Sequence, residues 1–392
     1  MPSTGIGDVG ARPLADINES DQVPESRDER SAAQGSVETA ASLVHPHQLE
    51  VQEFSSYALI IDARSPHEYD EDHIPHAVNL PVVDDAEYAE VGTTHKTDQH
   101  AAYLIGVEYS LRNIASHIKP LISKYTPQDR FLVYCFRGGK RSRLWADNLR
   151  TIGFGVDVLA GGWKNYRRWV RAGLESLPRA FTYRVLCGPT GCGKTRILLE
   201  LQRQGHQVLE LEGLASHRGS LLGDLPGQPQ PKQKFLDTLV LDTLRGFDPR
   251  RPVWLEAESR KIGNLQIPDA LYEAMHRSPV VNIVAPMTER VKLWREDYPH
   301  FAGDPAGMVC KLEPLKPLVG KETLADWRAL ANSNRVDELF ESVMTRHYDP
   351  CYARSTRSSY GPKVEKRTVV LQSLERAELA KAVRRMAADF SD

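Results

Sequence analysis

The sequence predicts an α/β protein with a parallel-sheet domain, a second α/β domain and a helical C-terminal region. The first observation is that strand-like apolar runs alternate with helix-compatible stretches over residues 46–178. The second is that this alternation starts again and continues over residues 179–317. Alternation of this kind implies parallel sheets covered by helices. The third is length, because 392 residues suffice for two or three domains that each bury a core.

An acidic segment precedes these domains. Residues 1–45 contain few aromatic or large aliphatic side chains and cannot bury enough surface to offset ordering, so we expect a disordered tail. Residues 1–50 hold nine acidic and three basic side chains, while the whole chain has a net charge of -2, so the remainder is mildly basic. The acidic content argues against a transit peptide, and no apolar run is long enough for a membrane span. We therefore expect a cytoplasmic protein with no membrane partner.

Short apolar runs bounded by polar residues or glycine predict the strands of both α/β domains. In the first domain, strands are expected at residues 58–62, 77–81, 130–135 and 155–162, with a helix at 141–153. In the second, strands are expected at 183–187, 207–212, 252–256 and 280–285, with helices at 194–204, 233–245 and 268–277. Residues 318–392 form the expected helical region, with helix-compatible stretches that begin at residues 324 and 374.

The stretch YCFRGGKRS, residues 134–142, places Cys135 between a predicted strand and a predicted helix. Backbone N–H groups and the positive end of the helix dipole meet there, so we expect a thiolate nucleophile. The five cysteines include no Cys-x-x-Cys pair, which argues against a disulfide framework or a zinc knuckle. A buried, inert cysteine is the alternative. The predicted anion-binding loop comprises Arg137, Gly138, Gly139, Lys140 and Arg141.

The stretch GPTGCGKT, residues 188–195, has the Gly-x4-Gly-Lys-Thr pattern and lies between a predicted strand and a predicted helix. Backbone N–H groups of such a loop wrap a phosphate, the lysine adds a cation and the threonine can ligate Mg²⁺. We therefore expect phosphate or diphosphate binding here. The residues assigned to it are Gly188, Gly191, Gly193, Lys194 and Thr195.

Two further groups of residues could complete this second site. Glu256 and Glu258 follow a predicted strand, where a Mg²⁺ ligand is expected, although aspartate is the usual residue. Exposed loop carboxylates are the alternative. The stretch LEGLASHRGSLLG could contact a second anion or the substrate, or it could form a surface turn. Its candidate residues are His217, Arg218 and Ser220.

A basic stretch that also carries tyrosines spans residues 346–367. Cations make phosphate contacts, and aromatic rings stack on unpaired bases, so the stretch indicates RNA binding. A solvated basic face is the alternative. The candidate residues are Arg346, Tyr348, Tyr352, Arg354 and Arg357.

Two segments of the first domain, DARSPHEYDEDHIPHAVNLP and LAGGWKNYRRW, resemble rhodanese-like domains. Asp72 stands where that family usually has glycine. The Cys-x5-Arg spacing is that of the related phosphatases rather than of the sulfurtransferases. A roomier loop suits a tetrahedral, phosphate-bearing substrate.

The ordered combination of CFRGGKRS, CGPTGCGKT, LEGLASHRGSLLG, VWLEAESRKIG and YDPCY resembles the bacterial tRNA 2-selenouridine synthase family. The resemblance implies a transferase that replaces the sulfur of wobble 2-thiouridine by selenium from selenophosphate. It also implies that a geranyl group from geranyl diphosphate is first attached to the sulfur and that geranylthiol is then exchanged for selenium. The implied partners are tRNA, selenophosphate and geranyl diphosphate, with Mg²⁺ as an optional ion and no tightly bound cofactor.

The same resemblance suggests roles for the candidate residues. Cys135 takes the place of the selenation cysteine, the phosphate loop would hold the diphosphate of geranyl diphosphate, and residues 346–357 would bind the tRNA. Gly92, in the stretch AEVGTTHK, would border the acceptor or prenyl site. Two other functions remain compatible with the residues: an ATP-dependent tRNA sulfurtransferase with a persulfide on Cys135, and a rhodanese- or phosphatase-like regulator that binds no RNA.

Overall fold

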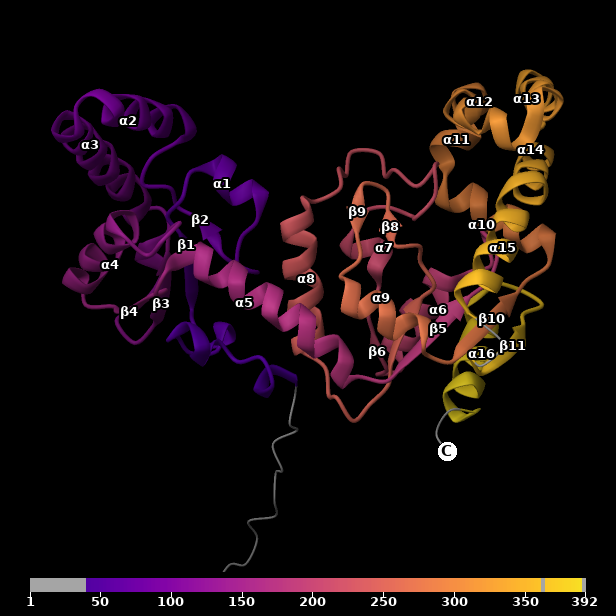
Figure 1. Cartoon of the computed structure of the whole chain (residues 1–392), viewed down its shortest axis with the longest axis horizontal. Coiled ribbons are helices and arrows are strands. Elements are labelled where there is room, and N and C mark those ends of the chain that lie inside the picture. The colour runs from indigo at the N-terminus through magenta and orange to yellow at the C-terminus, as the bar shows by residue number, and fades with distance from the viewer. Residues whose placement is uncertain (1–39, 361–363, 390–392) are drawn as a thin grey trace, which may run out of the picture. The chain divides into compact units, whose positions relative to one another are not determined.

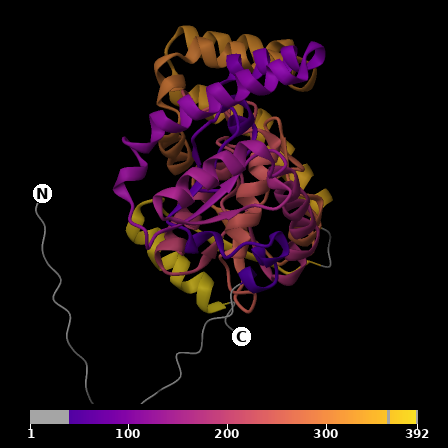
Figure 2. The same cartoon turned by 90° about the vertical axis from the view of Figure 1, so that its left-hand side faces the viewer.

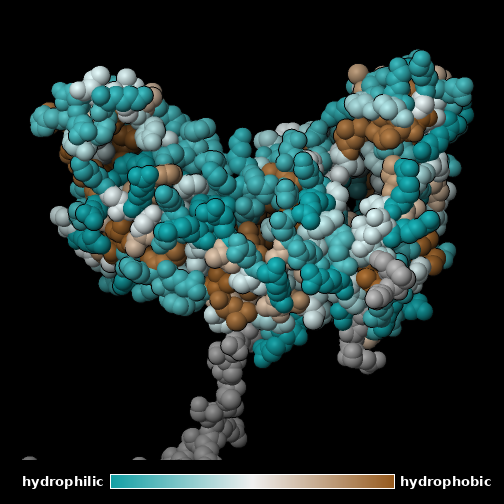
Figure 3. All heavy atoms as spheres, viewed as in Figure 1, coloured by the Kyte–Doolittle hydropathy of each residue, from teal (hydrophilic) through white to brown (hydrophobic). Residues whose placement is uncertain are grey.

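The computed structural model describes residues 40–360 and 364–389, and it confirms the predicted fold class (Figure 1). Two parallel sheets are followed by a helical C-terminal region. Most of the predicted acidic tail lies outside the described residues. Within the described ranges, no helix is both long and apolar enough to cross a membrane. The face shown in Figure 3 is mainly hydrophilic, with apolar surface in scattered patches.

The first sheet has the strand order β2–β1–β3–β4, with all neighbours parallel. Its central strands are buried along nearly their whole length, as expected of strands covered on both faces. The strands are β1 (Leu59–Asp62), β2 (Val78–Asn79), β3 (Arg130–Tyr134) and β4 (Gly155–Val158). The helices around them are α1 (Pro66–Glu71), α4 (Lys140–Ile152) and α5 (Gly162–Ser176).

A helical hairpin that the strand analysis did not predict is inserted between β2 and β3 (Figures 1 and 2). It consists of α2 (Asp85–Thr97) and α3 (Gln99–Ile118). Asp84 starts α2 through a capping box with Glu87, and the Asp98 carboxylate caps α3. Because α2 buries none of its residues, it carries no apolar stripe that periodicity could detect.

The second sheet has the order β11–β10–β5–β7–β6, again with all neighbours parallel. Its strands are β5 (Tyr183–Cys187), β6 (Gln207–Val208), β7 (Val253–Glu256), β10 (Val280–Val284) and β11 (Lys366–Val370). Its helices are α6 (Lys194–Arg203), α7 (Leu211–Leu214), α8 (Gln233–Arg245), α9 (Asp269–His276) and α16 (Arg376–Asp389). A separate antiparallel ribbon joins β8 (Lys261–Ile262) and β9 (Leu265–Gln266).

The structure corrects two of the expected elements. The strand predicted at 207–212 ends at Val208, because the Glu210 carboxylate accepts a bond from Gly213 N at 2.8 Å and starts α7 instead. The region expected to be helical contains β11, which pairs with β10 as the outer strand of the second sheet. β11 alternates between exposed and half-buried residues, so its sequence lacks the apolar run of a central strand.

Most of the C-terminal helices pack around an apolar cluster of their own, which includes Trp294, Met308, Trp327 and Phe340. These helices are α10 (Met287–Asp297), α11 (Pro299–Gly303), α12 (Pro305–Leu312), α13 (Lys316–Asn332) and α14 (Val336–Val343), and α15 (Asp349–Ser359) follows them. A π-helical turn, Met344–Tyr348, separates α14 from α15. Short 3-10 helices are η1 (Ala40–Ser42), η2 (Pro46–Leu49), η3 (Phe54–Ser56), η4 (Ile122–Lys124), η5 (Leu177–Ala180) and η6 (Glu313–Leu315).

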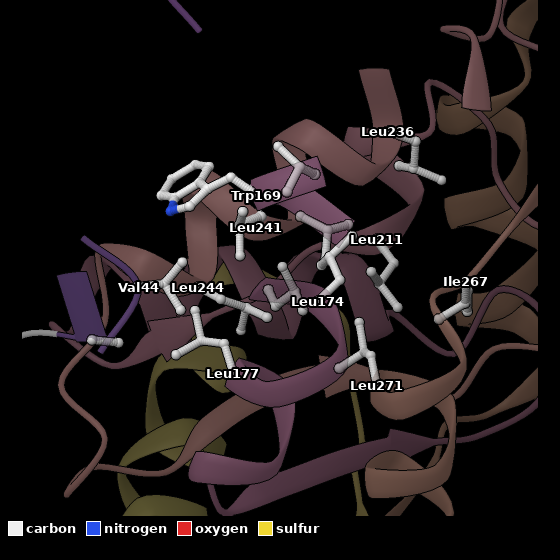
Figure 4. Packing of buried hydrophobic residues seen from close by; sticks show 14 of the residues in the cluster. Val44, Trp169, Leu174, Leu177, Leu211, Leu236, Leu241, Leu244, Ile267 and Leu271 are labelled. Atoms are coloured by element: carbon white, nitrogen blue, oxygen red, sulfur yellow. The ribbon is translucent and has the colours of Figure 1, made fainter. Parts of the chain in front are cut away.

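A shared apolar core joins α5 of the first domain to α8 of the second (Figure 4). Trp169 and Leu174 on α5 lie in the same buried cluster as Leu241 and Leu244 on α8. Gly173 permits this close approach, because a Cβ there would lie 2.8 Å from a methyl group of Leu241.

Asp72 adds a buried polar connection beside this core. Its carboxylate accepts bonds from Trp163 Nε1 at 2.9 Å and from Thr238 Oγ1, on α8, at 2.8 Å. Arg167 lies 3.5 Å from Asp72 and also pairs with Asp237 on α8 at 2.9 Å. Burial raises the pKa of Asp72 to about 6, although the Arg167 charge opposes this shift. Asp72 therefore ties the two domains together.

Candidate active sites

The cysteine loop connects the end of β3 to the start of α4 and is closed on one side by the Gly-Gly segment before α5. Gly138 has φ +68°, and a Cβ there would lie 2.7 Å from the Leu159 carbonyl. A Cβ on Gly162 would lie 2.2 Å from the Cys135 carbonyl. Trp163 N also donates to that carbonyl at 2.8 Å. The loop and the α5 N-terminus thus fix each other, which explains the glycines at both places.

Cys135 is buried, and its surroundings favour the thiolate. Ser142 Oγ lies 3.3 Å from Cys135 Sγ and must be the donor when the cysteine is a thiolate. Burial opposes ionisation, but the Ser142 bonds, the Arg141 charge and the Arg137 amide together lower the pKa of Cys135 below its ordinary value. Arg141 is itself held by Glu68 at 2.6 Å. The predicted activation of this thiol therefore has a definite structural cause.

An open pocket of about 430 Å³ leads to Cys135. Of the predicted loop residues, Arg137, Gly139, Lys140 and Arg141 line it, together with Tyr88 from α2, whereas Gly138 does not. Arg137 and Lys140 are exposed cations at its edge, and Lys140 Nζ lies 3.4 Å from the ring centre of Tyr103 on α3. The unpredicted hairpin therefore forms one wall of this site. Gly92 lies one turn after Tyr88 on an exposed part of α2 and does not line the pocket.

We predict that Cys135 titrates at lower pH than an ordinary thiol. Replacing Ser142 by alanine removes the hydroxyl that stabilises the thiolate, so the midpoint should move to higher pH. Thiolate ultraviolet absorbance, recorded against pH and corrected by subtracting the Cys135→Ser curve, measures that midpoint. An unchanged midpoint in Ser142→Ala would show that Ser142 does not stabilise the thiolate.

The phosphate loop lies between β5 and α6, as predicted. Gly188, Gly191 and Gly193 have φ values of +152°, +76° and +88°, which side chains other than glycine rarely adopt. Lys194 Nζ donates to the Gly188 carbonyl at 2.9 Å, across the loop. Burial alone would lower the pKa of Lys194, but Cys192, Glu212 and Glu258 raise it, so the amine stays charged.

A pocket of about 390 Å³ adjoins this loop. The structure brings six of the predicted residues together here, because the lining includes Gly191, Gly193, Lys194, Thr195, Arg218 and Ser220. His217 plays a different part, since its buried ring accepts from Gly219 N at 3.1 Å and shapes the turn. The lining also includes a set of apolar and aromatic side chains, Leu199, Leu225, Leu293, Trp294 and Tyr298.

Glu212, which the sequence did not suggest, lies beside the two predicted carboxylates, Glu256 and Glu258. Its N–H donates to Glu256 Oε1 at 2.9 Å, and its own carboxylate lies 3.5 Å from Thr195 Oγ1. Burial and the neighbouring carboxylates raise the pKa values of Glu256 and Glu258. Glu256 Oε2 is buried without a hydrogen-bond partner.

The positions of these carboxylates indicate which of them could serve as Mg²⁺ ligands. In the parts of the chain that the structure describes, no group of three or more His, Cys, Asp or Glu side chains could hold a metal ion. Mg²⁺ beside phosphates commonly needs only one or two protein oxygens. Thr195 and Glu212 border the pocket and are the oxygens that fit such an ion. Ligation by Glu256 and Glu258 remains a prediction.

The C-terminal stretch contacts the phosphate loop. The Tyr352 hydroxyl accepts a bond from Gly188 N, and the Asp349 carboxylate pairs with Arg290 at 2.6 Å. Arg290 Nε in turn donates to the Thr190 carbonyl at 2.8 Å. The YDPCY motif thus supports the loop from α15, a role that spacing in the sequence could not show.

The remaining RNA-binding candidates lie on the outside of this region. Arg346, Arg354 and Arg357 are exposed, although Arg346 pairs with Asp326 at 2.7 Å. Tyr348 is half-buried against the helical cluster. The three arginines are therefore available to phosphates, whereas Tyr348 and Tyr352 contribute mainly to packing.

Comparisons with known proteins match both α/β domains. The rhodanese-like domain model matches residues 46–168, and the model of the tRNA 2-selenouridine synthase AAA domain matches residues 181–304. A tRNA 2-selenouridine synthase of Nitrosomonas europaea is 34% identical, over 61% of this chain and 63% of its own length. Those of Aeromonas salmonicida and Hydrogenovibrio crunogenus are 36% and 33% identical, over 62% and 61% of this chain and 65% and 67% of theirs.

The fold and its loops define a class of protein in which a rhodanese-like domain with a loop cysteine precedes a phosphate-loop domain. Within that class, the chain belongs to the tRNA 2-selenouridine synthase family. The alignments with the first relatives span 63 to 65% of the relatives' length.

Proposed function

We propose that the protein modifies the wobble uridine of tRNA, replacing the sulfur of 2-thiouridine by selenium in two steps. In the first, the sulfur attacks C1 of geranyl diphosphate, and diphosphate leaves. In the second, the P–Se bond of selenophosphate breaks and its phosphoryl group is released to water as phosphate, while selenium bonds to C2 of the base and geranylthiol leaves. Family membership supports the tRNA substrate, because each relative compared above is named a tRNA 2-selenouridine synthase.

The observation that carries the geranyl step is the composition of the phosphate-loop pocket. The loop and Lys194 offer N–H groups and a cation, which suit a diphosphate. The apolar side chains that line the same pocket suit a hydrocarbon chain. Arg218 and Ser220 add a second set of donors at the same pocket. If Mg²⁺ is present, Thr195 and Glu212 would hold it, and it would stabilise the departing diphosphate.

The cysteine loop supports the selenium step. Selenophosphate is a tetrahedral anion, and Arg137, Lys140 and the N-terminus of α4 offer positive charge around the Cys135 pocket. The exposed arginines Arg346, Arg354 and Arg357 are assigned to the phosphate groups of tRNA.

Product mass tests this function directly. An anticodon stem-loop that carries 2-thiouridine is incubated with the protein, geranyl diphosphate and selenophosphate, and the nucleosides are then analysed. We expect S-geranyl-2-thiouridine when selenophosphate is omitted and 2-selenouridine when both donors are present. A sulfur-containing product that forms only with ATP would favour the sulfurtransferase. Tight binding of ATP, but not of geranyl diphosphate, would remove the proposed role of the phosphate loop.

A further inference from the structure

We propose that Cys135 attacks the phosphorus of selenophosphate, forms a cysteinyl phosphate and releases hydrogenselenide as the selenium donor. The inference rests on the proposed function and adds the chemical step at this site. Its physical basis is the loop, in which a buried thiol faces an open pocket bordered by cations. Such a pocket orients a tetrahedral phosphate with its phosphorus toward the sulfur.

The residues around Cys135 suit an attack on phosphorus. Arg141 follows Cys135 by six positions, its charge acts on the thiol, and Glu68 fixes its guanidinium at 2.6 Å. Two further cations, Arg137 and Lys140, stand exposed at the rim of the pocket. These positive charges are placed to balance the phosphoryl oxygens during displacement.

The electron balance also favours phosphorus, and not selenium, as the atom that the Cys135 thiolate attacks. When the Cys135 thiolate attacks phosphorus, an S–P bond forms, the P–Se bond breaks, and its electron pair leaves with selenium. With a proton from solvent, selenium departs as hydrogenselenide, already in the oxidation state that it has in 2-selenouridine. Attack on selenium would instead give an S–Se bond, and an additional thiol reductant would be needed to release the selenium.

The second half of the cycle restores the enzyme. Hydrogenselenide bonds to C2 of the geranylated base, and the C2–S bond breaks to release geranylthiol. Water then cleaves the S–P bond, so that inorganic phosphate leaves and the thiolate reforms. Ser142 Oγ, 3.3 Å from the sulfur, donates its hydrogen bond to the leaving thiolate. No oxidant or reductant enters at any point.

The test uses the full-length protein with selenophosphate alone, without RNA or geranyl diphosphate. After acid quenching, the peptide that contains Cys135 should carry the mass of one added HPO3 group, and the adduct should survive dithiothreitol. The adduct should be absent from Cys135→Ser. In Ser142→Ala, the adduct, once formed, should be hydrolysed about tenfold more slowly, because the leaving thiolate loses its hydrogen-bond donor. Cys310→Ser, which removes an exposed thiol on α12, is the control and should keep the adduct.

The outcomes separate this inference from the proposed function. A selenium-containing adduct on Cys135 that dithiothreitol removes would overturn the attack on phosphorus while leaving the selenation function intact. The attack on phosphorus would also be overturned if the protein selenated the stem-loop but no phosphorylated Cys135 were found, in the wild type or in Ser142→Ala. A phosphorylated Cys135 in a protein that never selenates the stem-loop would support the step and reject the proposed function instead.

Discussion

Replacement of Cys135 by serine is expected to abolish selenium transfer while geranyl transfer continues. Serine is similar in size, but its hydroxyl stays protonated at neutral pH. Arg141 and Ser142, which favour ionisation of the Cys135 thiol, therefore cannot produce a comparable nucleophile. Loss of a nucleophile typically lowers a rate on the order of a thousandfold or more. The geranyl step should be unaffected, because it is assigned to the phosphate loop and its separate pocket.

Both products can be followed by mass on the same thiolated stem-loop. With Cys135→Ser, S-geranyl-2-thiouridine should accumulate at the wild-type rate and should persist when selenophosphate is added. Cys310→Ser serves again as the control and should make both products, since that thiol is exposed on α12 and lines neither pocket. If a normally folded Cys135→Ser protein lost both activities, the assignment of the selenium step to the cysteine loop and of the geranyl step to the phosphate loop would be wrong.

The predicted helices and strands agree with the structure where the apolar pattern is local and strong. β5 and α8 lie at the predicted residues, because each presents a continuous or periodic apolar run to the core. Prediction failed where tertiary contacts decide. α2 buries no residue, and β11 is a half-exposed outer strand, so neither carries a pattern that distinguishes it from loop or helix. At Glu210, one side-chain cap changed an expected strand into a short helix.

In the candidate sites, too, local features could be predicted from the sequence, whereas features that depend on tertiary contacts could not. The glycines and the charged residues of both loops follow from local backbone chemistry, so their spacing could be recognised in the sequence. Glu212, Tyr88 and Asp349 could not be assigned in this way, because their roles depend on long-range contacts with residues far away in the chain. The YDPCY motif includes Asp349, but in the sequence it supported only the family resemblance, while the basic stretch around it predicted RNA binding.

Replacement of Lys194 by alanine is expected to lower the rate of geranyl transfer about a hundredfold to a thousandfold, as for loss of one charged donor at a reaction centre. The raised pKa of Lys194 keeps the amine charged, and its Nζ lies at the loop that would wrap the diphosphate. Without that charge, the departing diphosphate loses the cation that the loop supplies. The selenium step, tested on a stem-loop that was geranylated beforehand, should proceed normally.

The matched control is Lys292→Ala, which removes an exposed lysine on α10 that pairs with Glu375 and lies outside the phosphate-loop pocket. Thermal unfolding of both variants shows whether the fold survives, which matters because Lys194 Nζ also donates to Gly188 within the loop. Arginine at position 194 should restore only part of the rate, since it keeps the charge but not the compact ammonium. Normal geranyl transfer by folded Lys194→Ala would place the diphosphate elsewhere, and a nucleotide would then become the better candidate for this loop.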